Sequence, residues 1–83
     1  MLERLILKEQ IDGRIQSTLN LLIEVYDQLL KGEENKPVMV EDLTKLCDAL
    51  KILFTAQATV VYDDYGWDQY KDLIYEMAER DTQ

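Results

Sequence analysis

The stretch of sequence that decides the fold covers residues 11–32 and reads IDGRIQSTLNLLIEVYDQLLKG. Its apolar side chains recur at steps of three and four residues, which is the spacing of one face of an α-helix. They are Ile11, Ile15, Leu19, Leu22, Tyr26, Leu29 and Leu30. Gly32 predicts the end of this helix, because glycine takes the left-handed conformation after a helix without strain. We predict a helix over about residues 2–31.

Two features make this predicted helix irregular. Gly13 lies inside it and costs about 1 kcal/mol relative to alanine, so we expect the helix to bend there or its first turns to fray. Leu21, Ile23 and Leu30 widen the apolar stripe beyond a single face. A long helix that is apolar on more than one side usually contacts two neighbours or a second subunit.

A second helix is predicted after a short polar connection, residues 33–37 (EENKP), which ends in the only proline of the chain. The helix begins between Pro37 and Glu41, and its apolar residues keep helical spacing as far as Val61. Ile52 lies off the main apolar face, which again indicates a second contact.

The chain reverses once more at residues 62–66 (YDDYG), and a third helix follows. We predict that it begins at Trp67, or one or two residues earlier, and ends at Arg80. Asp63 or Asp64 is the expected N-cap, because an aspartate side chain accepts a hydrogen bond from the free backbone N–H groups of the first turn.

The predicted fold class follows from three amphipathic helices joined by two short loops. Such helices pack as antiparallel neighbours. We therefore predict an all-α protein with one domain over residues 1–83: a small antiparallel three-helix bundle (up-down-up) with a long first helix. Residues 81–83 are expected to fray.

The predicted third helix has an apolar side and an acidic side. The apolar side carries Trp67, Tyr70, Leu73, Ile74, Met77 and Ala78. We expect Trp67 and Tyr70 to be core anchors, because aromatic side chains on an apolar face are usually buried. On the other side Asp64, Asp68, Asp72 and Glu76 follow one another at steps of four, with Glu79 beside them. Like charges at this spacing repel one another, which costs stability.

Aromatic residues gather in the same part of the chain, and Tyr75 is expected to project beside the acidic side chains. Tyrosine brings a large rigid ring and a polar tip, so an acidic surface with tyrosines suits a basic groove on a partner. The candidate partner-binding residues are Asp63, Asp64, Tyr65, Asp68, Asp72, Tyr75, Glu76 and Glu79. The alternative interpretation is that these charges form only a solvated outer face.

The net charge of -8, from 17 acidic and 9 basic residues, bears on the choice of partner. A chain with few cations releases few counterions, so we expect no direct binding of nucleic acid and none of anionic membranes. The same charge favours a protein partner with a basic surface. Solubility alone is the other explanation of such a charge.

The sequence lacks the residues on which most catalytic and metal sites depend. It has no histidine and a single cysteine, Cys47, which lies among apolar residues and is expected to be buried and unreactive. Gly13, Gly32 and Gly66 are isolated, so no phosphate-binding loop is present. We therefore predict no catalytic residue, no cofactor and no metal, and a protein that is not an enzyme. No signal-peptide or membrane-span pattern is visible, which predicts a cytoplasmic protein.

These expectations lead to a ranked set of functions. The first is a small acidic interaction module, an inhibitor, modulator or immunity-type protein that binds a basic or nucleic-acid-binding surface of a larger protein through its third helix. The second is a structural subunit that forms a helical homo-oligomer, with a homodimer as the simplest form, through Leu21, Ile23 and Ile52. A carboxylate–metal hydrolase is the remote third. No motif is specific enough to name a family.

Overall fold

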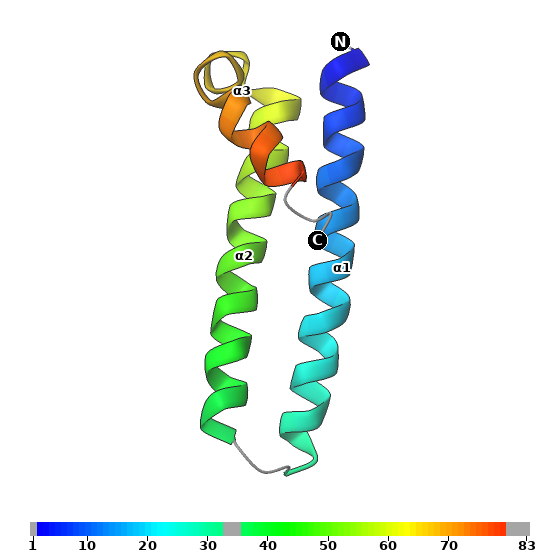
Figure 1. The fold of residues 1–83 in the computed structure, drawn as a ribbon, viewed down its shortest axis with the longest axis vertical. Coiled ribbons are helices and arrows are strands. Elements are labelled where there is room, and N and C mark those ends of the chain that lie inside the picture. The colour runs from blue at the N-terminus through cyan, green and yellow to red at the C-terminus, as the bar shows by residue number, and fades with distance from the viewer. Residues whose placement is uncertain (1, 33–35, 80–83) are drawn as a thin grey trace.

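The computed structural model describes residues 2–32 and 36–79. Three helices make up almost all of it: α1 (Leu2–Leu30), α2 (Lys36–Tyr62) and α3 (Asp64–Glu79) (Figure 1). The described residues contain no strand. The predicted all-α class, the three helices and the long first helix are therefore confirmed.

The first two helices form a long hairpin, and α3 covers only one end of it. In Figure 1 the chain runs along α1 away from the N-terminus and returns along α2 beside it. The third helix, with 16 residues against 29 and 27, packs where α1 begins and α2 ends. The molecule is consequently elongated, with extents of 47 × 21 × 18 Å.

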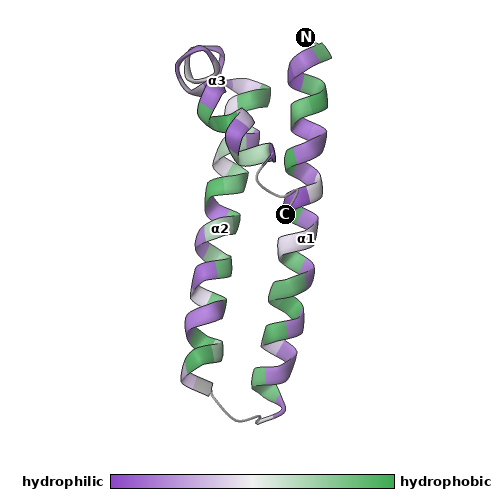
Figure 2. Cartoon of the chain, viewed as in Figure 1, coloured by the Kyte–Doolittle hydropathy of each residue, from purple (hydrophilic) through white to green (hydrophobic). Residues whose placement is uncertain are grey.

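The buried core lies entirely at the end of the hairpin that α3 covers. Its members are Leu7, Ile11, Ile15, Leu50, Leu53, Ala56, Val60, Trp67, Ile74 and Ala78. Among the described residues of 16–32 and 37–49, none is buried to the same degree. Apolar segments nevertheless continue along both helices to the loop end in Figure 2. The two halves of the hairpin thus have similar hydropathy, but α3 packs against only one of them.

The joint between α2 and α3 is a single residue, Asp63, so the predicted loop over residues 62–66 is wrong. The Asp63 N–H still donates to the Thr59 carbonyl (3.2 Å), which extends the hydrogen bonding of α2 to the joint. The Asp63 side chain accepts a hydrogen bond from the Gly66 N–H (3.0 Å). Asp63 is therefore the N-cap, as one of the two predicted alternatives stated, and α3 begins three residues before Trp67.

The two remaining glycines behave differently from one another. Gly32 has a φ of 73°, in the left-handed region, and its N–H donates to the Leu29 carbonyl (3.1 Å). The predicted stop of the first helix is thus confirmed. By contrast, α1 continues as one helix from Leu2 through Gly13, so of the two alternatives, a bend or frayed first turns, the fraying is not seen. The regular hydrogen bonds of the flanking turns outweigh the cost of one glycine.

The second helix begins at Lys36, slightly earlier than predicted. Proline is well suited to the first turn of a helix, where its missing N–H has no partner to lose, so Pro37 does not delay the helix. The rest of the predicted first loop (33–35), and the predicted helix end and frayed tail (80–83), lie outside the described residues.

Cys47 is exposed, which corrects the expectation of a buried thiol. It lies in the half of the hairpin that α3 does not reach, so its apolar neighbours along α2 are not covered either. None of the three described helices is long and apolar enough to cross a membrane.

Candidate protein-interaction surface

The inner face of α3 holds this helix against the hairpin. Trp67, Ile74 and Ala78 recur at steps of seven and four and are all buried in the core. Arg4 of α1 reaches over the Trp67 ring, with its guanidinium carbon 5.4 Å from the ring centroid. The same guanidinium donates to the Val60 carbonyl (2.9 Å) and to the Asp64 carboxylate (2.7 Å). One side chain of α1 therefore contacts the end of α2 and the start of α3.

A second set of contacts connects the later turns of α3 to α1. The Tyr75 hydroxyl donates to the Glu3 carboxylate, and Arg14 donates to the Met77 carbonyl. The hydrogen bond to Glu3 raises the pKa of Tyr75 to about 12, because it stabilises the neutral phenol beside a negative charge. The Tyr75 ring is also 6.0 Å from that of Trp67. The flank of α3 that carries Tyr75 thus faces α1.

Three of the eight predicted binding residues take part in these internal contacts. Asp63 caps α3, Asp64 pairs with Arg4, and Tyr75 is half-buried between α3 and α1. Asp63 and Asp64 remain exposed, so both can still contribute charge to the surface.

The other five predicted residues share the outer side of α3. Asp68, Asp72, Glu76 and Glu79 are all exposed, and Tyr65 is 78% exposed. Within the described ranges, neither Asp68 nor Asp72 makes a hydrogen bond or an ion pair. The structure therefore brings these five side chains onto one solvent-facing surface, with two carboxylates that no described cation neutralises.

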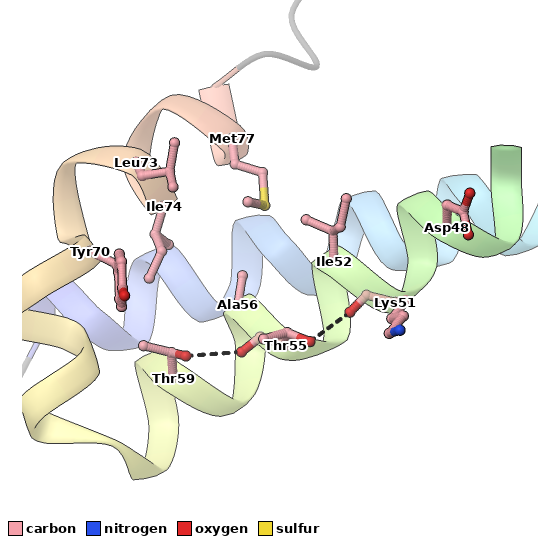
Figure 3. A pocket seen from close by; sticks show the side chains of 10 residues that line it. All are labelled: Asp48, Lys51, Ile52, Thr55, Ala56, Thr59, Tyr70, Leu73, Ile74 and Met77. Atoms are coloured by element: carbon pink, nitrogen blue, oxygen red, sulfur yellow. Dashed lines mark hydrogen bonds between the residues drawn. The ribbon is translucent and has the colours of Figure 1, made fainter.

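An apolar cleft of about 590 Å³ opens between α2 and the other flank of α3, and sequence reasoning did not find it. It is lined by Asp48, Lys51, Ile52, Thr55, Ala56, Thr59, Tyr70, Leu73, Ile74 and Met77. Figure 3 shows the α3 side chains on one side of the opening and the α2 side chains on the other. The Thr55 and Thr59 hydroxyls donate to carbonyls within α2 (2.8 and 3.1 Å), so the hydrogen-bonding capacity of these donors is already used. The cleft has the size and the apolar lining of sites that accept organic side chains or ligands.

Tyr70 lines this cleft and is 50% exposed, so its expected role as a core anchor is wrong, whereas that of Trp67 is confirmed. Tyr70 stays exposed because the apolar residues of α3 span a wide arc around the helix. The helix can bury only the central part, around Trp67 and Ile74, against the hairpin. Tyr70 and Leu73 fall on the flank. The breadth of this arc was the signal in the sequence that could have indicated a second apolar surface.

The acidic side chains lie at different distances from the cleft around α3. At about 100° per residue, Glu76 is roughly 60° from Leu73, whereas Asp68 is roughly 140° from it. Glu76 is therefore the acidic residue of α3 closest to the cleft around the helix, although it is not part of the lining, and Asp68 lies nearer to the flank that faces α1. Asp48 adds a carboxylate, and Lys51 an ammonium group, on the α2 side of the opening.

The fold and this surface define a small all-α three-helix protein with an apolar cleft beside an acidic helix face. No protein-family model matches the chain, and neither a curated protein nor a solved structure matches it significantly. Across residues 2–32 and 36–79, no three carboxylate or thiol side chains gather closely enough to hold a metal ion.

Proposed function

We propose that this protein is a non-catalytic interaction module that binds a basic, amphipathic segment of a larger protein. The observation that carries the proposal is the apolar cleft between α2 and α3, which lies beside the acidic outer side of α3. This is a refinement of the function expected from the sequence, since the cleft supplies an apolar anchor point that the acidic residues alone do not provide.

The affinity of such a complex would come mainly from the cleft. Ile52, Tyr70 and Leu73 each leave about half of their surface exposed. Covering them removes apolar area from water, which is worth roughly 25 cal/mol per Å² before the costs of association are subtracted. Tyrosine in such a position is also a frequent hot spot.

The acidic residues would act mainly on partner choice and on the rate of encounter. Glu76 is the acidic residue of α3 closest to the cleft around the helix, while Asp68 and Asp72 extend the exposed negative surface along α3. Carboxylates at the rim of an interface attract a basic partner over distances up to about the Debye length. Added salt shortens this length and so weakens the attraction. A partner segment that normally contacts nucleic acid phosphates through lysine or arginine would be covered by this contact, which is how the module would inhibit or modulate it. We place this action in the cytoplasm, where the single thiol, Cys47, stays reduced.

The proposal is tested with a synthetic amphipathic helix that carries leucine on one face and lysine on the other, followed by fluorescence anisotropy. We expect saturable binding that weakens with salt. The variant Leu73→Ser should weaken binding by about tenfold, because it removes one wall of the cleft. Glu76→Gln should weaken binding less but reduce its salt dependence.

Two controls make this experiment decisive. Leu21→Ser changes a leucine of similar exposure on α1, outside the cleft, and should bind the peptide as the unchanged protein does. A peptide with glutamate in place of every lysine should bind poorly. Equal binding of both peptides, or equal affinity of the Leu73→Ser and Leu21→Ser variants, would contradict the proposal.

A second candidate function, a subunit of a helical assembly, is favoured by a different observation. Exposed apolar residues, among them Ile23, Leu30 and Phe54, lie on the side of the hairpin that faces away from α3.

A further inference from the structure

We propose that two copies of this chain associate through the side of the α1–α2 hairpin that faces away from α3, so that their four long helices form a bundle. This side, here called the back face, carries Ile23, Tyr26 and Leu30 on α1 and Val40, Cys47 and Phe54 on α2. The inference goes beyond the proposed function and does not depend on it.

The internal contacts of α3 show which side of α1 is the back face. Glu3 and Arg14 of α1 both hydrogen-bond to α3. At about 100° per residue, Ile23 lies roughly 180° and Leu30 roughly 160° around the helix from Arg14. These two side chains therefore point away from α3.

The lining of the cleft locates the back face on α2 in the same way. Ile52 and Ala56 of α2 face α3 across the cleft. Phe54 lies roughly 160° around α2 from each of them, and Cys47 lies roughly 140° from Ile52. The side chains of α1 and α2 that point away from α3 thus share one side of the hairpin.

The back face has the periodicity of a helix–helix seam. On α2, Val40, Cys47 and Phe54 are separated by seven residues, and Leu43 and Leu50 lie at the intermediate positions. On α1, Ile23, Tyr26 and Leu30 follow one another at steps of three and four, and Leu19 precedes them by four. A repeat of 3.5 residues is the spacing with which helices pack as bundles and coiled coils.

Leu50 of this seam is already buried in the core and Leu19 packs against it, whereas the outward positions of the seam lack cover within the described chain. Ile23 is 60% exposed and Leu30 is 67% exposed, and Val40 and Phe54 are each about half exposed. Soluble monomers rarely expose large contiguous apolar patches, and such a patch usually marks an interface.

The size of the back face suits a stable dimer. The whole molecule, α3 included, measures 47 × 21 × 18 Å, so a contact that runs along its 47 Å axis is long enough to bury the roughly 800 Å² per partner of a standard interface. A two-fold axis would place the same residues on both sides of the contact, which is the commonest arrangement of a homodimer.

The distribution of charge favours a second copy over a basic partner on this face. Lys8 and Asp12 lie on the same side of α1 and form an ion pair (2.6 Å), so their charges cancel each other. The exposed acidic residues of α3 lie on the far side of the hairpin. Two copies of charge -8 can therefore meet here without bringing those carboxylates together, while a basic surface would find no excess of acid.

The test measures the mass of the full chain in solution by light scattering and sedimentation equilibrium over a range of concentrations. We expect a dimer, with twice the 9.8 kDa of one chain. Ile23→Glu and Phe54→Glu each place a charge in the seam and should weaken dimerisation by at least about tenfold. Circular dichroism of each variant checks that the helices persist.

Leu21→Glu is the matched control, because Leu21 is 48% exposed on the same helix but points to the α3 side. It should remain dimeric. The alkylation rate of Cys47 gives a second measurement without any substitution: it should fall as protein concentration rises, since association covers this thiol. A single-chain mass at every concentration, or a dimer that Leu21→Glu disrupts while Ile23→Glu and Phe54→Glu do not, would overturn the inference. Neither result bears on peptide binding at the cleft.

Discussion

At the scale of single residues, a few side chains of α1 determine how α3 sits on the hairpin. Arg4 contacts both the Val60 carbonyl and the Asp64 carboxylate while it covers the Trp67 ring. A planar guanidinium can make these contacts together, whereas the compact ammonium group of lysine cannot. None of these pairings is local in the sequence, so the pattern of residues could not predict them.

The contact between Tyr75 and Glu3 predicts a specific titration. Folding raises the pKa of Tyr75 from 10.0 to about 12, so this hydrogen bond stabilises the protein fully below pH 10 and ceases to do so as the pH rises from 10 to about 12. In the folded protein, the ultraviolet absorbance of tyrosinate should therefore show a late-titrating group near pH 12.

Two variants assign that late titration. Tyr75→Phe should remove it, and Glu3→Gln should return the pKa of Tyr75 towards 10 because the negative acceptor is gone. A late titration that persists in Tyr75→Phe would show that another tyrosine is responsible and would refute the assignment.

At the scale of elements, the joint between α2 and α3 depends on Gly66. A Cβ at this position would come within 2.9 Å of the Asp63 Cγ and 3.1 Å of the Thr59 Cγ2. The Asp63 side chain would then have to leave the backbone N–H group that it caps. Gly66 has no positive φ, so its backbone conformation does not require glycine. Glycine is required at this position because a side chain would have no room beside Asp63 and Thr59.

Two substitutions of glycine by alanine should consequently have opposite effects. Gly66→Ala should lower the free energy of unfolding by about 1–2 kcal/mol through loss of the cap. Gly13→Ala should raise it by up to about 1 kcal/mol, because an added Cβ at this exposed helical position meets no atom within 4 Å. Urea denaturation of both variants measures the two changes. A shift of the same sign in both would contradict this account of the joint.

The third helix also shows how far an element can be predicted from its own residues. Its acidic and apolar sides follow from helical periodicity alone. Which part of the apolar arc becomes core depends on the hairpin, whose surface accommodates Trp67 and Ile74 and leaves Tyr70 and Leu73 beside a cleft.

At the scale of the whole molecule, the asymmetry of the core is the main feature. Among residues 2–32 and 37–79, every buried residue lies at the end that α3 covers, and the other half of the hairpin has only half-buried contacts between α1 and α2. Cover by a second copy would supply this half with the burial that α3 supplies to the first.

This asymmetry predicts that thermal stability depends on protein concentration. Because association favours the folded state by mass action, the unfolding midpoint should rise as concentration increases. Ile23→Glu should remove most of this dependence, and Leu21→Glu should retain it. Circular dichroism melts at several concentrations provide the measurement. A midpoint that stays constant in the unchanged protein would argue against the dimer.

The sequence by itself determined the local features of this protein. Apolar spacing predicted three helices, Gly32 predicted the end of the first, and Asp63 was one of two predicted caps, because each depends on interactions between residues a few positions apart. Only the tertiary structure decided that Tyr70 and Cys47 are exposed, that Tyr75 contacts Glu3, and that a cleft opens along α3. These outcomes depend on the placement of a short third helix at one end of a longer hairpin, and residues far apart in the chain determine that placement.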